Sequence, residues 1–116
     1  MPSRRGDIVL ALFPNSDLKT TKKRPALVVQ TDGLNTGMPR LVVAMTTSSL
    51  SRAGHPTRVP ISLSSAVGRR TNLITDSVIV TDNLATILET EISRTLGLWS
   101  DMASEEDTIR HTFGLR

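Results

Sequence analysis

Cysteine is absent from this chain of 116 residues, and its absence removes several kinds of chemistry. Disulfide bridges, zinc sites built on thiolates and cysteine nucleophiles are excluded together, and a reducing cytoplasmic setting fits this composition. Long apolar runs are missing as well, because the longest, residues 8–13, is far too short to cross a bilayer. We therefore expect a soluble cytoplasmic protein with no membrane partner.

The chain also has few aromatic side chains, only Phe13, Trp99 and Phe113. Recognition built on a row of rings that stack on nucleobases is therefore disfavoured. A nucleic acid would have to be bound through its phosphates and its base edges. Trp99 itself is expected to pack in the core or at a dimer interface.

Positive charge is concentrated in the first half of the chain. The net charge is only +3, but residues 1–60 contain nine Lys or Arg against three Asp, whereas residues 61–116 contain five against eight acidic residues. An anionic partner should therefore meet loops from the first half, and nucleic acid is the commonest partner of this kind.

Short apolar segments separated by turn formers predict a single, mainly β domain over residues 1–116. The predicted strands cover residues 8–13, 26–30, 41–45, 58–63, 78–81 and 84–87, with an interruption at residues 82–83. Pro60 places its strand at a sheet edge or a bulge. Only the end of the chain is typical of a helix, with Ser100 as the predicted N-cap and Gly114 as the stop. This pattern predicts a small β-barrel or sandwich with a C-terminal α-helix.

A polar loop, residues 15–24, ends in three consecutive cations, Lys22, Lys23 and Arg24, which Pro25 follows. A residue before proline is restricted to extended backbone, so we expect Arg24 to be the last loop residue, held by a rigid chain. Most surface arginines are solvated or pair weakly with a carboxylate. This feature alone therefore favours an ordinary structural role for Arg24.

Four segments taken together resemble the MazF/PemK family of toxin endoribonucleases. They are residues 5–10 (RGDIVL), residues 24–29 (RPALVV), Thr47-Ser48 after an apolar strand, and residues 76–82 (DSVIVTD). Each segment is weak evidence by itself, but their order and spacing match the family across nearly the whole chain.

The resemblance implies an SH3-like small β-barrel of about six or seven strands with a C-terminal α-helix. It also implies a homodimer that cleaves single-stranded RNA, neutralised by a cognate antitoxin whose acidic tail covers the RNA groove. The family's catalytic arginine corresponds to Arg24 and its catalytic threonine to Thr47, and Asp82 matches the aspartate after the late strand.

Cleavage of RNA requires no protein nucleophile, because the 2′-hydroxyl beside the scissile phosphate supplies one. A guanidinium such as that of Arg24 can make paired hydrogen bonds to the phosphoryl oxygens as their charge grows. Thr47, supported by Thr46 or Ser48, can hydrogen-bond a non-bridging oxygen. We therefore expect no metal ion and no cofactor, with a 2′,3′-cyclic phosphate and a 5′-hydroxyl as products.

The remaining candidates carry weaker arguments. His55 has the side-chain type that accepts protons near neutral pH, although a lone histidine in a Gly-His-Pro loop is more often solvated. Asp82 fits a turn-holding role at least as well as a supporting catalytic role. The candidate RNA-binding residues are Asn15, Lys22, Lys23, Arg58, Arg69 and Arg70, and the cations among them also fit solvated faces.

Two other functions stay open at this point. A related barrel could bind and poison a protein target such as a topoisomerase, and this activity would not depend on Arg24 or Thr47. A nonspecific RNA-binding module would show a steep salt dependence and would leave no cleavage products.

Overall fold

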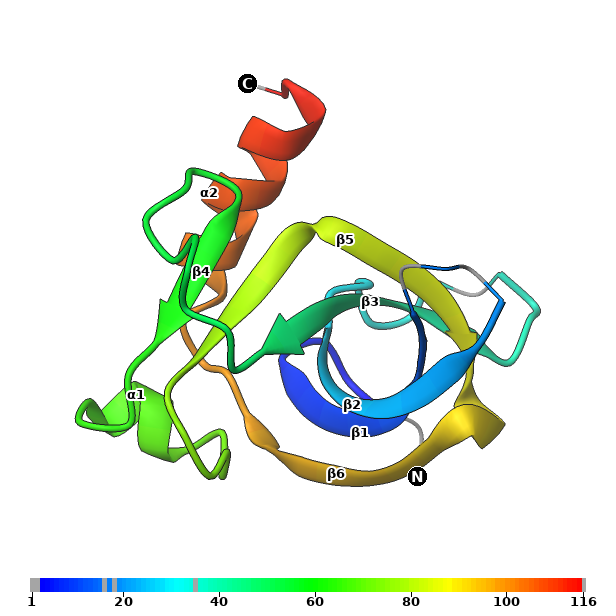
Figure 1. Cartoon of the computed structure of the whole chain (residues 1–116). Helices are drawn as coiled ribbons and strands as arrows, with labels where there is room; N and C mark the ends of the chain where they lie inside the picture. The colour runs from blue at the N-terminus through cyan, green and yellow to red at the C-terminus, as the bar shows by residue number, and fades with distance from the viewer. Residues whose placement is uncertain (1–2, 16, 18, 35, 116) are drawn as a thin grey trace.

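The computed structural model describes residues 3–15, 17, 19–34 and 36–115, so Ser16 and Leu18 of the predicted polar loop lie outside the described residues. The described residues form six strands, a short helix, a 3-10 turn and a C-terminal helix (Figure 1). The elements are β1 (Asp7–Pro14), β2 (Thr21–Val28), β3 (Arg40–Thr47), β4 (Arg58–Ile61), α1 (Ala66–Arg69), β5 (Ser77–Leu88), the 3-10 turn η1 (Glu89–Glu91), β6 (Ile92–Leu98) and α2 (Met102–Phe113).

The strands form one antiparallel sheet in the order β4-β5-β3-β2-β1-β6. The sheet curls into an open barrel whose two edge strands, β4 and β6, do not pair with each other (Figure 1). The predicted mainly β fold with a C-terminal helix is therefore confirmed. Pro60 lies in the edge strand β4, where its missing N–H leaves no gap in a ladder.

Apolar side chains fill both faces of the curled sheet. One cluster packs on its inner face, and a second, which includes Trp99, packs on the face that α2 covers. Burial on both faces explains why residues 8–13 form a continuous apolar run and do not alternate. The expected packing of Trp99 in the core is met, because its side chain is buried in the second cluster.

The start of β2 corrects one prediction. Arg24 is not the last loop residue, because β2 already begins at Thr21, and Arg24 is paired with Ala11 of β1. The exposed residues Thr21, Lys22 and Lys23 have no apolar pattern, and their pairing with β1 rests on the backbone alone. The strand ends at Val28, two residues earlier than predicted.

Strand β5 corrects a second prediction, because it runs without a break through residues 82–83. The predicted interruption corresponds to a bulge: the β3 partner of Val80 is Met45, and the partner of Leu84 is the adjacent Ala44. The extra residues of β5 therefore have no opposite residue in β3. Strand β6, which pairs with β1, was not among the predicted strands.

The C-terminal helix begins one residue later than predicted, because the N-cap is Asp101 and not Ser100. Its Oδ1 accepts a hydrogen bond from the N–H of Ser104 at 3.4 Å. Gly114 ends the helix in the left-handed conformation, at φ 67°, as expected for a C-terminal glycine. In the described ranges, no helix has both the length and the apolar character needed to cross a membrane.

Candidate nucleic-acid interface

A groove of about 290 Å³ opens beside Arg24 at one end of the curled sheet. We call it the Arg24 groove. Its lining consists of Lys22, Lys23, Arg24 and Pro25 of β2, Thr46 and Thr47 from the end of β3 with Ser48 directly after it, Leu73, Ile74 and Thr75 from the segment before β5, and Ser77, the first residue of β5. The groove thus combines cations with hydroxyl groups.

Strand geometry explains why Arg24 and Thr47 line the same groove. Ala26 of β2 and Met45 of β3 are paired residues at the end of the β2–β3 ladder. Arg24 is two positions before Ala26 and Thr47 is two positions after Met45, and residues two apart in a strand lie on the same face. The two side chains therefore continue the inner face of the sheet beyond the last pair.

The Arg24 guanidinium is held from the tip of the β1–β2 hairpin. Its Nη2 donates to Oδ1 of Asn15 at 2.8 Å, and Nδ2 of Asn15 donates to Oγ1 of Thr20 at 2.8 Å. Asp17 fixes this tip by accepting from the N–H groups of Lys19 and Thr20, and these hydrogen bonds hold the pKa of Asp17 below its usual range. Asn15, predicted to bind RNA, thus contacts Arg24.

The Arg24 guanidinium has unused hydrogen-bonding capacity. Its Nε is buried without a hydrogen-bond partner. Within the described part of the chain, no carboxylate oxygen lies within 4.0 Å of its nitrogens. A planar cation with free donors in a groove is suited to an anion with several oxygens, such as a phosphate.

The hydroxyl groups at the end of β3 differ in their hydrogen bonds and in their exposure to solvent. Oγ1 of Thr47 accepts a hydrogen bond from the N–H of Ser49 at 3.1 Å, which leaves its own hydrogen free to donate. Oγ1 of Thr46 is buried without a partner, while Ser48 is exposed. All three residues line the Arg24 groove, and a free hydroxyl hydrogen can stabilise charge on a bound oxygen.

A second groove, of about 200 Å³, lies beside Arg58, and we call it the Arg58 groove. It is lined by Met45, Thr47, Ser49, Ser51, Arg52, Arg58, Val78 and Val80. Thr47 therefore lines both grooves. Asp82 is not part of this lining but lies beside Arg58, because its Oδ1 is 3.5 Å from Nη1 of Arg58, and neither residue lines the Arg24 groove.

Besides Asn15, which contacts Arg24, and Asp82, which contacts Arg58, three predicted residues line neither groove. Nδ1 of His55 accepts a hydrogen bond from the N–H of Thr57 at 3.2 Å and lies 2.9 Å from its Oγ1. Arg69 donates to the carbonyl oxygen of Ser64 at 2.9 Å, and Arg70 is exposed. The structure does not bring these side chains to Arg24 and Thr47.

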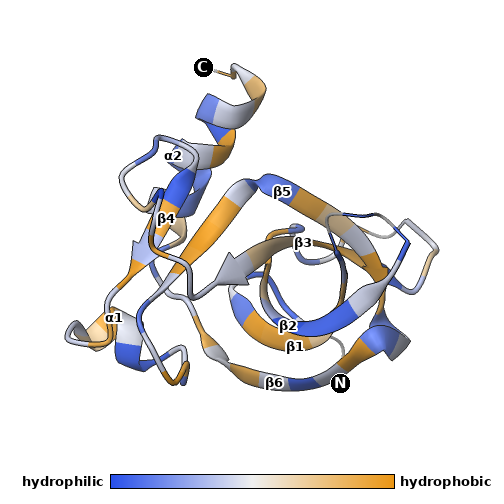
Figure 2. Ribbon diagram, viewed as in Figure 1, coloured by the Kyte–Doolittle hydropathy of each residue, from blue (hydrophilic) through white to orange (hydrophobic). Residues whose placement is uncertain are grey.

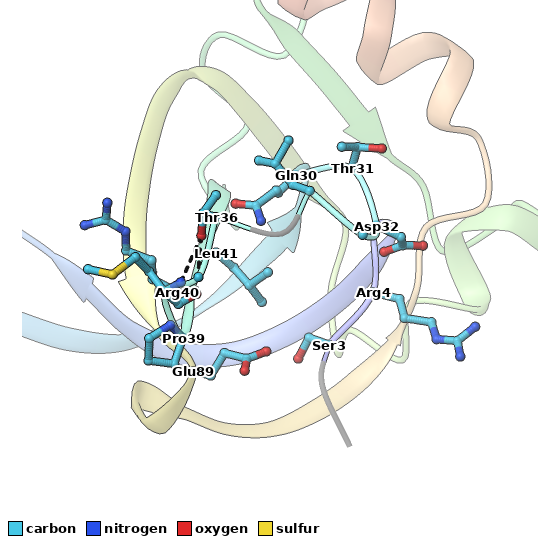
Figure 3. A pocket seen from close by; sticks show the side chains of 14 residues that line it. Ser3, Arg4, Gln30, Thr31, Asp32, Thr36, Pro39, Arg40, Leu41 and Glu89 are labelled. Atoms are coloured by element: carbon cyan, nitrogen blue, oxygen red, sulfur yellow. Dashed lines mark hydrogen bonds between the residues drawn. The ribbon is translucent and has the colours of Figure 1, made fainter.

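A hollow larger than either groove, of about 770 Å³, lies at the opposite end of β2 and β3, and none of the predicted site residues lines it. Two of its polar side chains accept hydrogen bonds from backbone N–H groups of the same chain. Asp32 accepts the N–H of Arg5 at 2.9 Å, and Gln30 accepts the N–H of Val42 at 3.2 Å. Figure 3 shows the side chain of Arg40 pointing away from the middle of the hollow.

Several residues of the two grooves were not predicted. Ile74 and Thr75 belong to the segment before β5, Ser77 is the first residue of β5, and Arg52 follows β3 in a loop. Ser77 lies within the motif at residues 76–82, although it was not named as a site residue. No local pattern identifies Ile74 or Arg52, because their position at a groove depends on the folded chain.

Comparisons with known proteins support the resemblance to the MazF/PemK family. A family model described as PemK-like, MazF-like toxin of type II toxin-antitoxin system matches residues 4–107. The protein named Endoribonuclease MazF from Staphylococcus saprophyticus is 32% identical over 104 residues, which are 89% of this chain and 82% of that relative.

Solved structures resemble the fold over its whole length. The Mycobacterium tuberculosis toxin MazF-mt6 matches with a TM-score of 0.72 and 24% identity over 97% of this chain and 99% of that chain. An endoribonuclease in complex with its cognate antitoxin, from a mycobacterial species, matches with a TM-score of 0.75 and 19% identity over 98% and 97% of the two chains. These likenesses establish the fold.

Proposed function

Because this chain belongs to the PemK-like, MazF-like toxins of type II toxin-antitoxin systems, we propose that it is a sequence-specific endoribonuclease that cuts single-stranded RNA without a metal ion. The relative from Staphylococcus saprophyticus, an endoribonuclease by name, supports the activity. The observation that carries the chemistry is the lining of one groove by the guanidinium of Arg24 and the hydroxyl of Thr47.

In the proposed reaction, the 2′-oxygen attacks the neighbouring phosphorus and the bond to the 5′-oxygen breaks. The 2′-hydroxyl loses its proton and the leaving 5′-oxygen gains one, so that a 2′,3′-cyclic phosphate and a 5′-hydroxyl result. Arg24 and Thr47 donate hydrogen bonds to the phosphoryl oxygens, which carry more negative charge in the transition state. Lys22 and Lys23 attract the flanking phosphates.

We propose a homodimer and a cognate antitoxin as the protein partners, and the cytoplasm as the site of action. The antitoxin is supported by the mycobacterial structure in which a related endoribonuclease is bound to one. Phe113 and Leu115, at the end of α2, are more than half exposed, so this end offers apolar area to a second subunit.

The proposal is tested by incubating the purified protein with a long single-stranded RNA in EDTA and mapping the cut sites by primer extension. We expect cleavage at a short recurrent sequence, and no cleavage where the nucleotide before the cut carries a 2′-deoxyribose. A requirement for magnesium, or cleavage of the deoxy substrate, would refute the chemistry.

Two groove variants and two control variants test whether the activity resides in the Arg24 groove. Arg24→Ala and Thr47→Ala should each lower kcat by about a hundredfold or more. The matched controls are Arg40→Ala and Thr86→Ala, at exposed positions of β3 and β5 that line neither groove, and they should cut normally. If both groove variants still arrest growth when expressed, the chain instead poisons a target without cutting RNA.

A further inference from the structure

Ile74 is by far the most exposed large apolar side chain in the described part of the protein. Its exposed fraction is 98%, whereas the other exposed large apolar residues range from 48% to 61%. A branched aliphatic side chain gains free energy when it leaves water. Its exposure at the rim of the Arg24 groove leaves this side chain free to contact a ligand that enters the groove.

The segment around Ile74 is held by the rest of the fold. Leu73 packs against the second core cluster. Asn72, in the left-handed conformation at φ 57°, donates from Nδ2 to the carbonyl oxygen of Leu96 at 2.8 Å. On the other side, Oδ1 of Asp76 accepts the N–H of Leu63 at 2.8 Å. The exposure of Ile74 is therefore a property of a supported segment.

The neighbours of Ile74 in the groove indicate what it contacts. Lys22, Lys23 and Arg24 supply positive charge, and none of the side chains that line the groove in the described structure is aromatic. A ligand that matches this lining carries an anionic group and, beside it, an apolar surface without charge. A nucleotide has both, since each base has a face that packs against apolar side chains.

We propose that Ile74 packs against the nucleobase next to the scissile phosphate and so sets the position of the RNA strand in the Arg24 groove. The inference rests on the proposed RNA cleavage. Ile74 is a substrate-positioning residue, which takes no part in proton transfer or charge stabilisation. Its loss should therefore act on KM and on the choice of the cut site, and leave kcat unchanged.

The experiment uses the full chain and a short single-stranded RNA that contains one mapped cut site. Ile74→Ala, Ile74→Leu and the control Leu34→Ala are compared, because Leu34 is also exposed but lines the hollow at the opposite end. Each protein is given the intact RNA and a set of RNAs in which one base beside the cut is removed.

We expect Ile74→Ala to raise KM about fivefold on the intact RNA, while Ile74→Leu and Leu34→Ala behave like the wild type. The difference between Ile74→Ala and the wild type should vanish on the RNA that lacks the contacted base. An unchanged KM, or a rise in KM that persists on every abasic RNA, overturns this inference. Neither result bears on the proposed cleavage of RNA.

Two other outcomes are also decisive. If Ile74→Ala cuts RNA normally but binds the cognate antitoxin more weakly, the side chain contacts protein and the inference is overturned. If the wild-type protein does not cut the RNA, the proposed function fails and the inference fails with it. Equal midpoints of urea unfolding for all four proteins establish that the folded state is unchanged.

Discussion

Replacing Glu105 by glutamine should remove a pH-dependent loss of stability that is built into helix α2. Glu105 is 1% exposed, and its Oε2 lies 3.5 Å from Nη2 of Arg5 without a hydrogen bond to it. Arg5 instead donates to Glu106. Burial raises the pKa of Glu105 from 4.5 to about 7, against the lowering effect of Arg5 and with a further rise from Glu106.

The direction of the effect follows from proton linkage. The folded chain holds the proton of Glu105 more tightly than the unfolded chain, so the free energy of unfolding falls as the pH rises from about 4.5 to 7. A pKa of about 7 in the folded chain and 4.5 in the unfolded chain corresponds to about 3 kcal/mol, lost in full above both values. Glutamine has nearly the same shape and carries no charge at any pH.

The assay is urea unfolding at pH 5 and at pH 8, followed by the fluorescence of Trp99, the single tryptophan, which is buried. At pH 8, Glu105→Gln should be more stable than the wild type by up to about 3 kcal/mol, and at pH 5 the two proteins should differ little. Asp107→Asn, at an exposed carboxylate on the same helix, should show the same pH dependence as the wild type. Equal pH dependence of Glu105→Gln and the wild type would refute the reasoning.

Three further variants test the grooves and the packing of β6. Lys23→Ala should reduce the salt slope of binding to an uncleavable 2′-deoxy-substituted RNA by about 0.7, and an unchanged slope would mean that this lysine contacts no phosphate. Asp82→Asn releases Arg58 from its ion pair and should tighten binding of the same RNA by up to about fivefold at low salt; unchanged affinity would place Arg58 outside the RNA path. Gly97→Ala should destabilise the fold by about 3 kcal/mol in urea unfolding, because its Cβ would lie 2.4 Å from a backbone oxygen. Gly54→Ala, which has open space around it, should have no effect.

The parts of the fold that sequence analysis predicted are those in which hydrophobic burial determines the structure. Strands β1 and β3 contain most of the inner core cluster, so their apolar runs were visible. The first half of β2 is hydrophilic (Figure 2) and pairs through its backbone, which leaves no pattern in the side chains. Strand β6 was missed because its residues 93–95 are exposed and Gly97 contributes no side chain.

For the candidate site too, some features could be predicted from the sequence and others depend on the folded chain. Arg24 and Thr47 could be named because the segments that contain them resemble the motifs of the MazF/PemK family, whereas the local pattern alone favoured an ordinary role for Arg24. The hydrogen bond of Asn15 to Arg24 was not predicted, since it depends on how the tip of the hairpin folds back. His55 was named from its side-chain type, but its imidazole contacts Thr57, a local arrangement that the side-chain type cannot indicate.

The division of β2 at Pro25 has a consequence for protein engineering. Residues 26–28 are buried, whereas residues 21–23 are exposed, so the second half of the strand contributes to stability, and the first half is the part to which we assign RNA binding in the proposed function. Mutations at Thr21, Lys22 and Lys23 need not disturb the core clusters, since none of these residues belongs to them. A library randomised at these three positions and at Thr75 should therefore yield folded variants with altered cutting preferences.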